Sequence, residues 1–464
     1  MQVGNKLEYG RLTALMALLA GCFLMGGASR SDVLSLIILQ PLAVVCAAAV
    51  LAIPGSVDWR SIRMPMLFLA LLAGTIAAQL IPLPPGIWTN LPGHAPFAES
   101  AQAAGLAQPW RPISLTPDLT LASLVGLVVP FAILLGFASV PPQRRQSMLL
   151  SALLAGTALS ALFGLAQVSS GDESPFYLYR ITNNGVAVGL FSNRNHEAVL
   201  LAMTWPLLAV WASVPHRDPR LRAARRWVAI GFGLFTLPLV LVTGSRAGLA
   251  LAAIGIIGAG VLWWLDRRSS RERAPEGLAR FIPLAVVVAG AGLFGATIVL
   301  SRAVAITRLT RLDGSGDMRF EATPVLLDMS RDFFPVGAGF GSFDPVFRSY
   351  EPLFMLDPEY LNHAHNDLLE LIITAGLPGV ALLLAFLVWA GKASWTAWRN
   401  ASPSLETNLA RAGSLMILLV LLSSLVDYPL RTPLMMAIVA IACGWLASAG
   451  RQVRRPTASS VRPK

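Results

Sequence analysis

The chain has 464 residues, of which 55% are hydrophobic and only 13% are charged, and its formal net charge is +11 at pH 7. The mean hydropathy of +0.63 excludes an ordinary soluble globular protein and predicts a protein that crosses a membrane many times. In such a chain we attribute the positive charge to membrane orientation and to contact with anionic lipid heads, and not to nucleic-acid binding.

Apolar stretches of about 17 to 25 residues, long enough to cross the hydrocarbon core of a bilayer, occur about twelve times. The predicted membrane spans are residues 11–28, 33–53, 64–83, 120–140, 147–168, 197–213, 227–243, 247–265, 281–300, 366–391, 410–427 and 432–449. Because a second span follows the first almost at once, we interpret the first as an uncleaved anchor and not as a signal peptide. We therefore expect a single polytopic membrane domain over residues 1–464.

The basic residues predict the orientation of this domain. If the N-terminus is cytoplasmic, roughly two thirds of the 36 Lys and Arg residues fall in cytoplasmic segments, as the positive-inside rule requires. The densest clusters, residues 217–226 and 267–280, and the tail 451–464 all lie on that side. Both termini are thus expected in the cytoplasm.

Three segments on the opposite side are long enough to carry chemistry: residues 84–119, 169–196 and 301–365. In the last and largest, residues 322–334 have apolar side chains at helical spacing, which predicts an amphipathic helix near the membrane surface. The glycine-rich segment 337–341 follows. We interpret it as a flexible turn, because no βαβ unit and no Gly-Lys-Ser/Thr sequence surrounds it to make a phosphate loop.

The most polar junction of the chain, His363-Ala-His365-Asn366-Asp367, comes directly before the apolar run 368–390. Ionisable groups at the mouth of a membrane helix usually mark a functional site. Residues two apart on a helix point about 200° apart, so we expect that the two imidazoles do not reach one substrate. Asn366 and Asp367 either fix the ring of His365 or cap the following helix. A His-x-His metal site is disfavoured, because no third ligand accompanies the pair at a useful spacing.

Three stretches, read in order, resemble the O-antigen ligase and O-antigen polymerase superfamily of bacterial envelope glycosyltransferases. Residues 189–195, Gly-Leu-Phe-Ser-Asn-Arg-Asn, are similar to that family's Gly-x-Phe-x-Asn-x-Asn element, and residues 244–248, Gly-Ser-Arg-Ala-Gly, to its Ser-Arg element. Residues 335–343, followed by His-Asn at 365–366, are similar to its large external loop and the helix after it. The resemblance covers roughly residues 180–390.

One departure from the family pattern leaves the branch open. Where the ligase branch tends to have a Gly-x-x-Thr-Gly ending, this chain has Gly376-Leu-Pro-Gly379, so ligase, polymerase and exopolysaccharide-assembly members all remain candidates. The resemblance implies an all-α integral membrane fold of about 12 transmembrane helices, with one large periplasmic loop at residues 301–365 and a GT-C-like glycosyltransferase architecture.

The resemblance also implies the reaction. A glycan is transferred from an undecaprenyl-pyrophosphate carrier to an acceptor hydroxyl at the periplasmic face of the bacterial inner membrane, in lipopolysaccharide or exopolysaccharide biosynthesis. The implied partners are this lipid-linked donor, a lipid or glycan acceptor and membrane lipids, with no nucleic acid and no cofactor. No Asp-x-Asp sequence occurs, which disfavours a metal-dependent sugar-nucleotide transferase.

The family match gives His365 the role of general base, which suits a side chain that titrates near working pH. The alternative is a histidine at the start of a helix, bonded to a neighbour. Arg246 is the expected pyrophosphate binder, because a guanidinium binds phosphate oxygens bidentately and keeps its proton. Arg180 and Arg194 are further candidates for this role, and a contact with lipid heads is the alternative for all three arginines.

The remaining site candidates are amides and the second histidine. Asn193 and Asn195 either bind sugar hydroxyls or phosphate, or cap the sixth span. His363 either contacts substrate or is structural, and Asn366 is counted with the substrate-binding group.

A second class of function competes with this one. Twelve spans with both termini inside are also common in transporters and in flippases of lipid-linked glycans. Such proteins tend to have internal repeats and ionisable residues in mid-membrane. We detect no repeat between the two halves of this chain, and its polar residues concentrate in one outer loop and its neighbours, which favours surface chemistry.

Overall fold

The computed structural model describes residues 2–269, 321–356, 361–400 and 404–452. Within these ranges the chain folds into helices joined by loops, with one isolated antiparallel bridge between Leu83 and Arg111. In chain order the helices are α1 (Gln2–Met25), α2 (Leu36–Ala52), α3 (Trp59–Ala78), α4 (Pro85–Trp88), α5 (Ala95–Ala103), α6 (Pro117–Gly126), α7 (Val128–Ser139), α8 (Pro142–Ser170), α9 (Arg194–Ser213), α10 (Pro219–Val242), α11 (Arg246–Ser269), α15 (Thr323–Phe333), α16 (Phe343–Tyr350), η2 (Leu353–Met355), α17 (Asp367–Arg399), α18 (Leu405–Ser423), η3 (Pro429–Arg431) and α19 (Pro433–Gln452).

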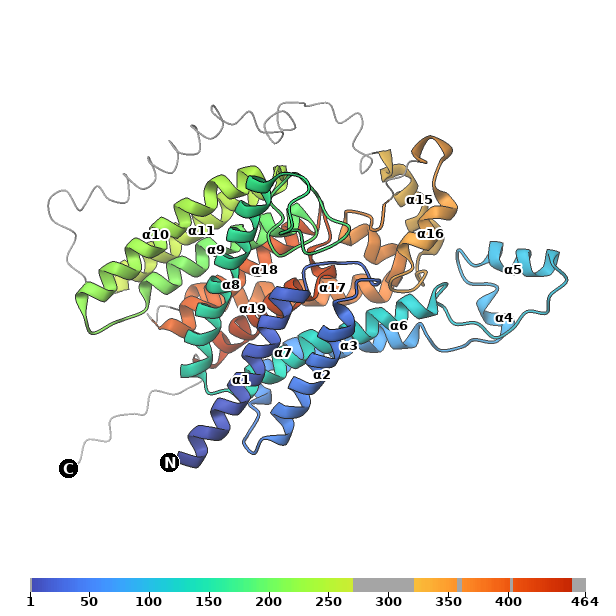
Figure 1. Ribbon diagram of the computed structural model, residues 1–464. Coiled ribbons are helices and arrows are strands. Elements are labelled where there is room, and N and C mark those ends of the chain that lie inside the picture. Colours follow the sequence, from blue (N-terminus) through green and yellow to red (C-terminus); the bar gives the residue numbers. More distant parts are fainter. Residues whose placement is uncertain (1, 270–320, 357–360, 401–403, 453–464) are drawn as a thin grey trace.

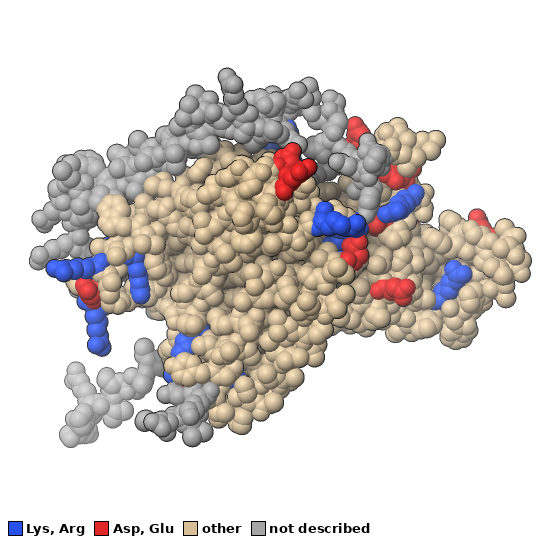
Figure 2. Space-filling view, viewed as in Figure 1, with Lys and Arg blue, Asp and Glu red and all other residues tan. Residues whose placement is uncertain are grey.

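Eight spans in the described ranges are long and apolar enough to cross a membrane: α1, α3, the adjoining α6 and α7, α8, α10, α11, α17 and α18. Two further apolar helices, α2 and the start of α19, are shorter. The predicted ninth span, residues 281–300, and the first part of the large loop, residues 301–320, lie outside the described residues. On the face drawn in Figure 2, a wide band without charged side chains separates the two charged ends of the described chain. This all-helical architecture is that of an integral membrane protein.

Helix α9 lies inside the bundle, packed against α8, α10, α11 and α18 (Figure 1). It contacts α11 so closely that a Cβ on Gly255 would lie 2.4 Å from the carbonyl oxygen of Ala202. Because protein and not lipid surrounds it, α9 tolerates polar side chains in its first turn, where Asn195, His196 and Glu197 are all buried. This helix covers the predicted sixth span, but it is not among the helices that are long and apolar enough to cross a membrane.

Backbone hydrogen bonds show which loops share an end of the bundle. Leu434 N–H donates to the carbonyl of Gly26 (2.9 Å), Ser192 N–H to that of Gly27 (3.1 Å), and Asp367 N–H to that of Ser424 (2.8 Å). The end of α1, the loop before α9, the start of α17 and the segment between α18 and α19 therefore meet at one end. That end also carries α15 and α16 (Figure 1).

Three buried arginines cap helices at the opposite end. Arg11 donates to the carbonyl of Ile53 after α2 (2.6 Å), Arg145 to that of Phe137 in α7 (2.9 Å), and Arg411 to that of Ala397 in α17 (3.2 Å). The last carbonyls of a helix lack intrahelical donors and carry partial negative charge, so a guanidinium satisfies both needs. Some of the basic residues that indicate orientation thus also stabilise helix ends.

Helix α17 is broken at Gly376, which has φ 56° and ψ −144°. The sequence predicted an uninterrupted span here; the break occurs because the segment after Pro335 inserts against it. Ala338 N–H donates to the carbonyl of Ile373 (2.8 Å), and Leu377 N–H donates to that of Pro335 (2.8 Å). A side chain at position 376 would have its Cβ 2.2 Å from the oxygen of Pro335, so only glycine fits.

The glycine-rich segment 337–341 is consequently held in place and is not a free turn. Gly339 N–H donates to the carbonyl of Thr374 (3.0 Å), and Gln79 at the end of α3 bonds both to that carbonyl (2.8 Å) and to the N–H of Phe340 (3.0 Å). The amphipathic helix expected at residues 322–334 is confirmed as α15. Its buried residues Leu326, Met329 and Phe333 join a small core with α16 and the start of α17.

Candidate functional site

The two histidines of the polar junction lie in the loop before α17, and neither is part of the helix. Asn366 is the N-cap, and its side-chain oxygen accepts hydrogen bonds from the N–H groups of Leu368 (3.0 Å) and Leu369 (3.1 Å). His365 has φ 49°, a left-handed conformation that is uncommon for a residue with a side chain. The expectation that the two imidazoles diverge around a helix is therefore wrong.

Both rings instead pack on the same aromatic side chain, Tyr428. The ring centroid of Tyr428 lies 4.3 Å from that of His363, 4.8 Å from that of His365 and 5.3 Å from that of His196 in α9. Tyr428 is buried and comes from the segment between α18 and α19. Three histidines from two parts of the chain thus surround one phenol.

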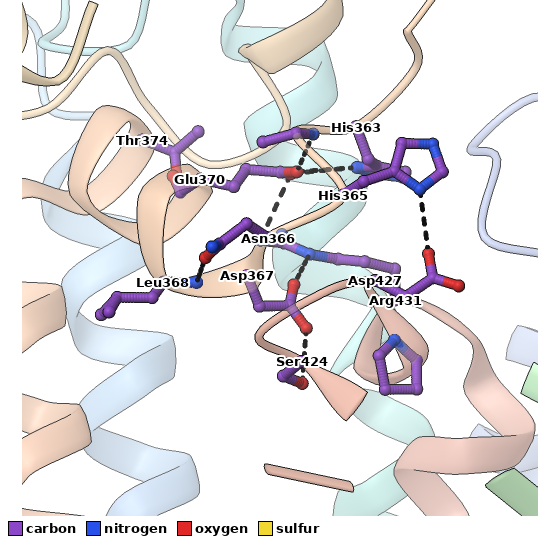
Figure 3. Close-up of polar contacts among 12 residues, drawn as sticks. His363, His365, Asn366, Asp367, Leu368, Glu370, Thr374, Ser424, Asp427 and Arg431 are labelled. Atoms are coloured by element: carbon purple, nitrogen blue, oxygen red, sulfur yellow. Dashed lines mark hydrogen bonds and ion pairs between the residues drawn. The ribbon is translucent and has the colours of Figure 1, made fainter. Parts of the chain in front are cut away.

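His365 pairs with a carboxylate from that same segment. Its Nδ1 lies 3.1 Å from Oδ1 of Asp427, whose side chain is 1% exposed (Figure 3). A carboxylate only accepts hydrogen bonds, so Nδ1 carries a proton, and in the neutral ring the lone pair is then on Nε2. The other oxygen of Asp427 accepts from the amide of Asn193 (3.3 Å) and lies 4.0 Å from Nε2 of His196. The ring of His365 is thereby fixed in one tautomer and one direction.

His363 makes a second histidine–carboxylate pair. Its Nδ1 lies 3.0 Å from Oε1 of Glu370, whose side chain is 1% exposed and also accepts from the N–H of Ala364 (3.0 Å). Arg431 lies 3.3 Å from the same Oε1. Although burial disfavours the charge of Arg431, Glu370 and Asp367 raise its pKa above the ordinary value, so this guanidinium stays protonated.

Asn366 and Asp367 had two alternative roles in the sequence, and the structure assigns neither of them to the ring of His365. Asn366 caps α17. Asp367 accepts from the hydroxyl of Ser424 (2.8 Å) and from Nε of Arg431 (3.3 Å) (Figure 3). Both residues therefore build the junction between α17 and the segment that carries Asp427.

The loop before α9 brings the first family-like element to this junction. Asn193 caps α9 through Oδ1, which accepts from the N–H of Asn195 (2.8 Å), while its amide nitrogen donates to Asp427. Of the two roles expected for Asn193, the structure shows helix capping, and the same side chain also contacts Asp427, the partner of His365. The side chain of Asn195 is buried in the first turn of α9, and Arg194 beside it is half-buried.

The remaining arginine candidates lie at the same end of the bundle. Arg246 is the first residue of α11 and is exposed. A Cβ on Gly248, two residues further on, would lie 2.4 Å from that of Ala198 in α9, so the first turns of α9 and α11 are side by side. Arg180 is exposed in the loop before α9. The pKa of Asp32 is lowered, first by the hydrogen bond from Arg30 and, as a smaller contribution, by the charge of Arg180.

Sequence reasoning missed Asp427, Glu370 and Arg431. Asp427 fell at the edge of a predicted span, and Glu370 fell one turn inside another. Ionisable residues inside or at the edge of apolar spans were the available signal. Glu370 is 7 residues from its partner His363 in the chain, and Asp427 is 62 residues from its partner His365, so local sequence does not show either pair. Among the described residues, no group of three or more His, Cys, Asp or Glu side chains is placed to hold a metal ion.

Comparison with known proteins gives one family. Residues 231–384, about a third of the chain, match the family model described as O-Antigen ligase. This range contains Arg246, the break of α17 at Gly376 and both histidines of the junction. The element at 189–195 lies before it. No curated protein sequence matches the chain. This match, together with the motif order noted above, supports a relationship of residues 231–384 to the O-antigen ligase and polymerase superfamily.

Proposed function

We propose that this protein transfers a glycan from an undecaprenyl-pyrophosphate carrier to an acceptor hydroxyl, with His365 as the general base. The observation that carries the proposal is the bond between Nδ1 of His365 and the buried carboxylate of Asp427. A histidine held in this way presents Nε2 as proton acceptor, and the carboxylate stabilises the imidazolium that forms. The side chain of His365 is 12% exposed, which leaves an edge for a substrate.

The reaction then proceeds as a single displacement. Nε2 of His365 takes the proton of the acceptor hydroxyl while the hydroxyl oxygen bonds to the anomeric carbon of the donor glycan. The bond between that carbon and the pyrophosphate oxygen breaks, and undecaprenyl pyrophosphate leaves with the electron pair. The proton on His365 is released to water afterwards.

The leaving pyrophosphate needs positive charge close to its oxygens. Arg246 fits this role, because it opens α11 beside the first turn of α9, where two helix N-termini add partial positive charge. Arg180 and Arg194 stand at the same end of the bundle and extend the cationic surface along the loop before α9. Asn195 and His363 are assigned to contacts with the sugars of donor or acceptor.

This end of the bundle faces the periplasm in the proposal, and both termini are cytoplasmic. The support is the sequence bias of basic residues, together with the Arg11, Arg145 and Arg411 caps at the opposite end of the bundle. The turn from α9 to α10, where Arg217 and Arg220 are exposed, also lies at that end, on the left of Figure 1.

The direct test is bond formation in detergent, where the protein is purified and no compartments exist. Purified protein is mixed with a synthetic undecaprenyl-pyrophosphate glycan and either a lipid A core acceptor or a second lipid-linked glycan, and products are resolved by mass spectrometry. A new glycosidic bond, together with released undecaprenyl pyrophosphate, is expected with one of the two acceptors. A protein that only moves the donor between leaflets in vesicles, and makes no bond with either acceptor in detergent, contradicts the proposal.

A further inference from the structure

The two members of the His365–Asp427 pair come from different elements. His365 precedes α17, whereas Asp427 lies in the segment 424–431, between the end of α18 and the start of α19. The chain between them is long, so their separation depends on whatever fixes the segment 424–431 against the first turn of α17. A misplacement of about 1 Å in such a pair is enough to lower a rate by about 10²-fold.

The segment 424–431 is attached at both of its ends to that one helical turn (Figure 3). At its first residue, the carbonyl of Ser424 accepts from Asp367 N–H (2.8 Å), and its hydroxyl donates to Asp367 Oδ2 (2.8 Å). At its last residue, Nε of Arg431 donates to Asp367 Oδ1 (3.3 Å), and the terminal nitrogen lies 3.3 Å from Glu370 Oε1. Asp427 lies between these two attachments.

We propose that Arg431 is a positioning residue for this site. Its guanidinium forms ion pairs with Asp367 and Glu370 in the first turn of α17 and thereby holds Asp427 opposite His365. The inference rests on the proposed role of His365 and adds a residue that acts through the pair without touching substrate. Ser424 and Arg431 both bond the first turn of α17, and of these two residues Arg431 is the charged one.

An arginine is required because two carboxylates must be held at once. Its planar guanidinium directs separate N–H groups at Asp367 and Glu370, whereas the compact ammonium of lysine lacks this fixed fork geometry. The Glu370 carboxylate is almost fully buried, so removing the guanidinium leaves a buried charge with one fewer cation. Glu370 also accepts the hydrogen bond from His363, so removing the Arg431 guanidinium also changes the surroundings of His363.

Arg431 also sets the electrostatic potential at the base. His365 contacts Asp427 and Tyr428 of the segment 424–431, and the rings of His363 and His196 contact the same Tyr428. Behind them lie Asp367, Glu370 and Arg431. Removing the one guanidinium of this group makes the potential more negative, which favours the protonated imidazole. The acidic limb of the pH–rate profile must then move to higher pH.

The test compares Arg431→Gln and Arg431→Lys with a matched control, Arg411→Lys, in the purified full-length protein. Arg411 is another buried arginine, but it caps the far end of α17. For Arg431→Gln we expect kcat to fall on the order of 10- to 100-fold, KM for the lipid-linked donor to stay within about twofold, and the acidic limb to shift upward. Arg431→Lys should keep the limb in place and recover part of kcat, and Arg411→Lys should leave kcat and the limb unchanged.

The inference is overturned if folded Arg431→Gln keeps the wild-type kcat and pH limb. It is also overturned if both Arg431 variants lose activity equally, in proportion to lost thermal stability and without a shift of the limb, because that pattern describes a purely structural residue. His365→Ala is assayed in parallel. If it is as active as wild type, the proposed function fails; if it is inactive while Arg431→Gln is fully active, only the positioning role fails.

Discussion

Replacing Asp427 with Asn changes one atom of the site and tests the histidine–carboxylate pair. In the wild type, both carboxylate oxygens accept hydrogen bonds, one from Nδ1 of His365 and the other from the amide of Asn193. An amide at position 427 has only one oxygen. If that oxygen accepts the hydrogen bond from Asn193, the NH₂ group of the new amide faces His365. Because an NH₂ group only donates, it can pair with His365 only when Nδ1 carries no proton. The proton then sits on Nε2, the atom that must receive the acceptor proton.

The size of the effect follows from these contacts. A hydrogen bond to a charged group contributes about 1.5–3 kcal/mol, which corresponds to a loss of roughly 10- to 160-fold if only the stabilisation of the imidazolium disappears. Loss of the base through the wrong tautomer extends the effect towards 10⁴-fold, the usual upper contribution of general-base catalysis. We expect kcat for Asp427→Asn to fall on the order of 10²–10³-fold.

The assay is single-turnover transfer with purified protein and saturating lipid-linked donor, measured across pH. Besides the lower rate, the acidic limb should move to lower pH, because the imidazolium has lost its anion. Asp328→Asn, a change of the same kind in an exposed ion pair of α15, serves as the control and should behave as wild type. A folded Asp427→Asn protein within about threefold of the wild-type rate, with an unmoved limb, would refute the pairing argument.

Three further predictions concern other parts of the structure. Arg246→Lys should lower transfer at least about tenfold at normal protein levels, because a point charge does not replace a bidentate contact with phosphate oxygens; near-normal transfer would remove Arg246 from the pyrophosphate site. Gly376→Ala should lower the free energy of unfolding by at least about 1–3 kcal/mol, because φ is 56° there and the new Cβ would also meet the oxygen of Pro335. Gly74→Ala, in open space on α3, should not lower it, and equal melting curves for the two variants contradict this prediction. A cysteine introduced at the exposed position Glu173 should be labelled by an impermeant thiol reagent in intact cells. A cysteine at the exposed position Arg217 should be labelled only in inverted vesicles. The reverse pattern overturns the orientation.

Hydropathy predicts most of the bundle because a helix that faces lipid must be apolar along its length. Eight of the predicted spans are helices long and apolar enough to cross a membrane, and two more are shorter apolar helices. The predicted sixth span is the helix α9, which is not one of these ten, and the ninth lies outside the described residues. The break at Gly376 was not foreseen, since the run 368–390 is uniformly apolar and the break depends on the insertion of the segment 335–341. A sequence pattern along one helix carries no information about a loop that inserts into it.

The site was predicted in part. His365 and Asn193 were named from local motifs, and the structure joins them through Asp427, which local sequence does not connect to either. The helical-wheel argument that separated His363 from His365 failed because Asn366, and not His363, begins the capped turn of α17. The partner of each histidine depends on tertiary contacts. The sequence therefore shows that ionisable residues occur in apolar surroundings, but not which of them pair.

The central claim is that His365, and not His363, is the base, and one measurement tests it most directly. Donor binding and single-turnover transfer are measured on purified His365→Ala and His363→Ala proteins, each with the same lipid-linked donor and acceptor. We predict that His365→Ala binds the donor normally but transfers on the order of 10²–10⁴-fold more slowly, while His363→Ala loses much less. Equal transfer rates for the two variants, or loss of donor binding in His365→Ala, would contradict the account.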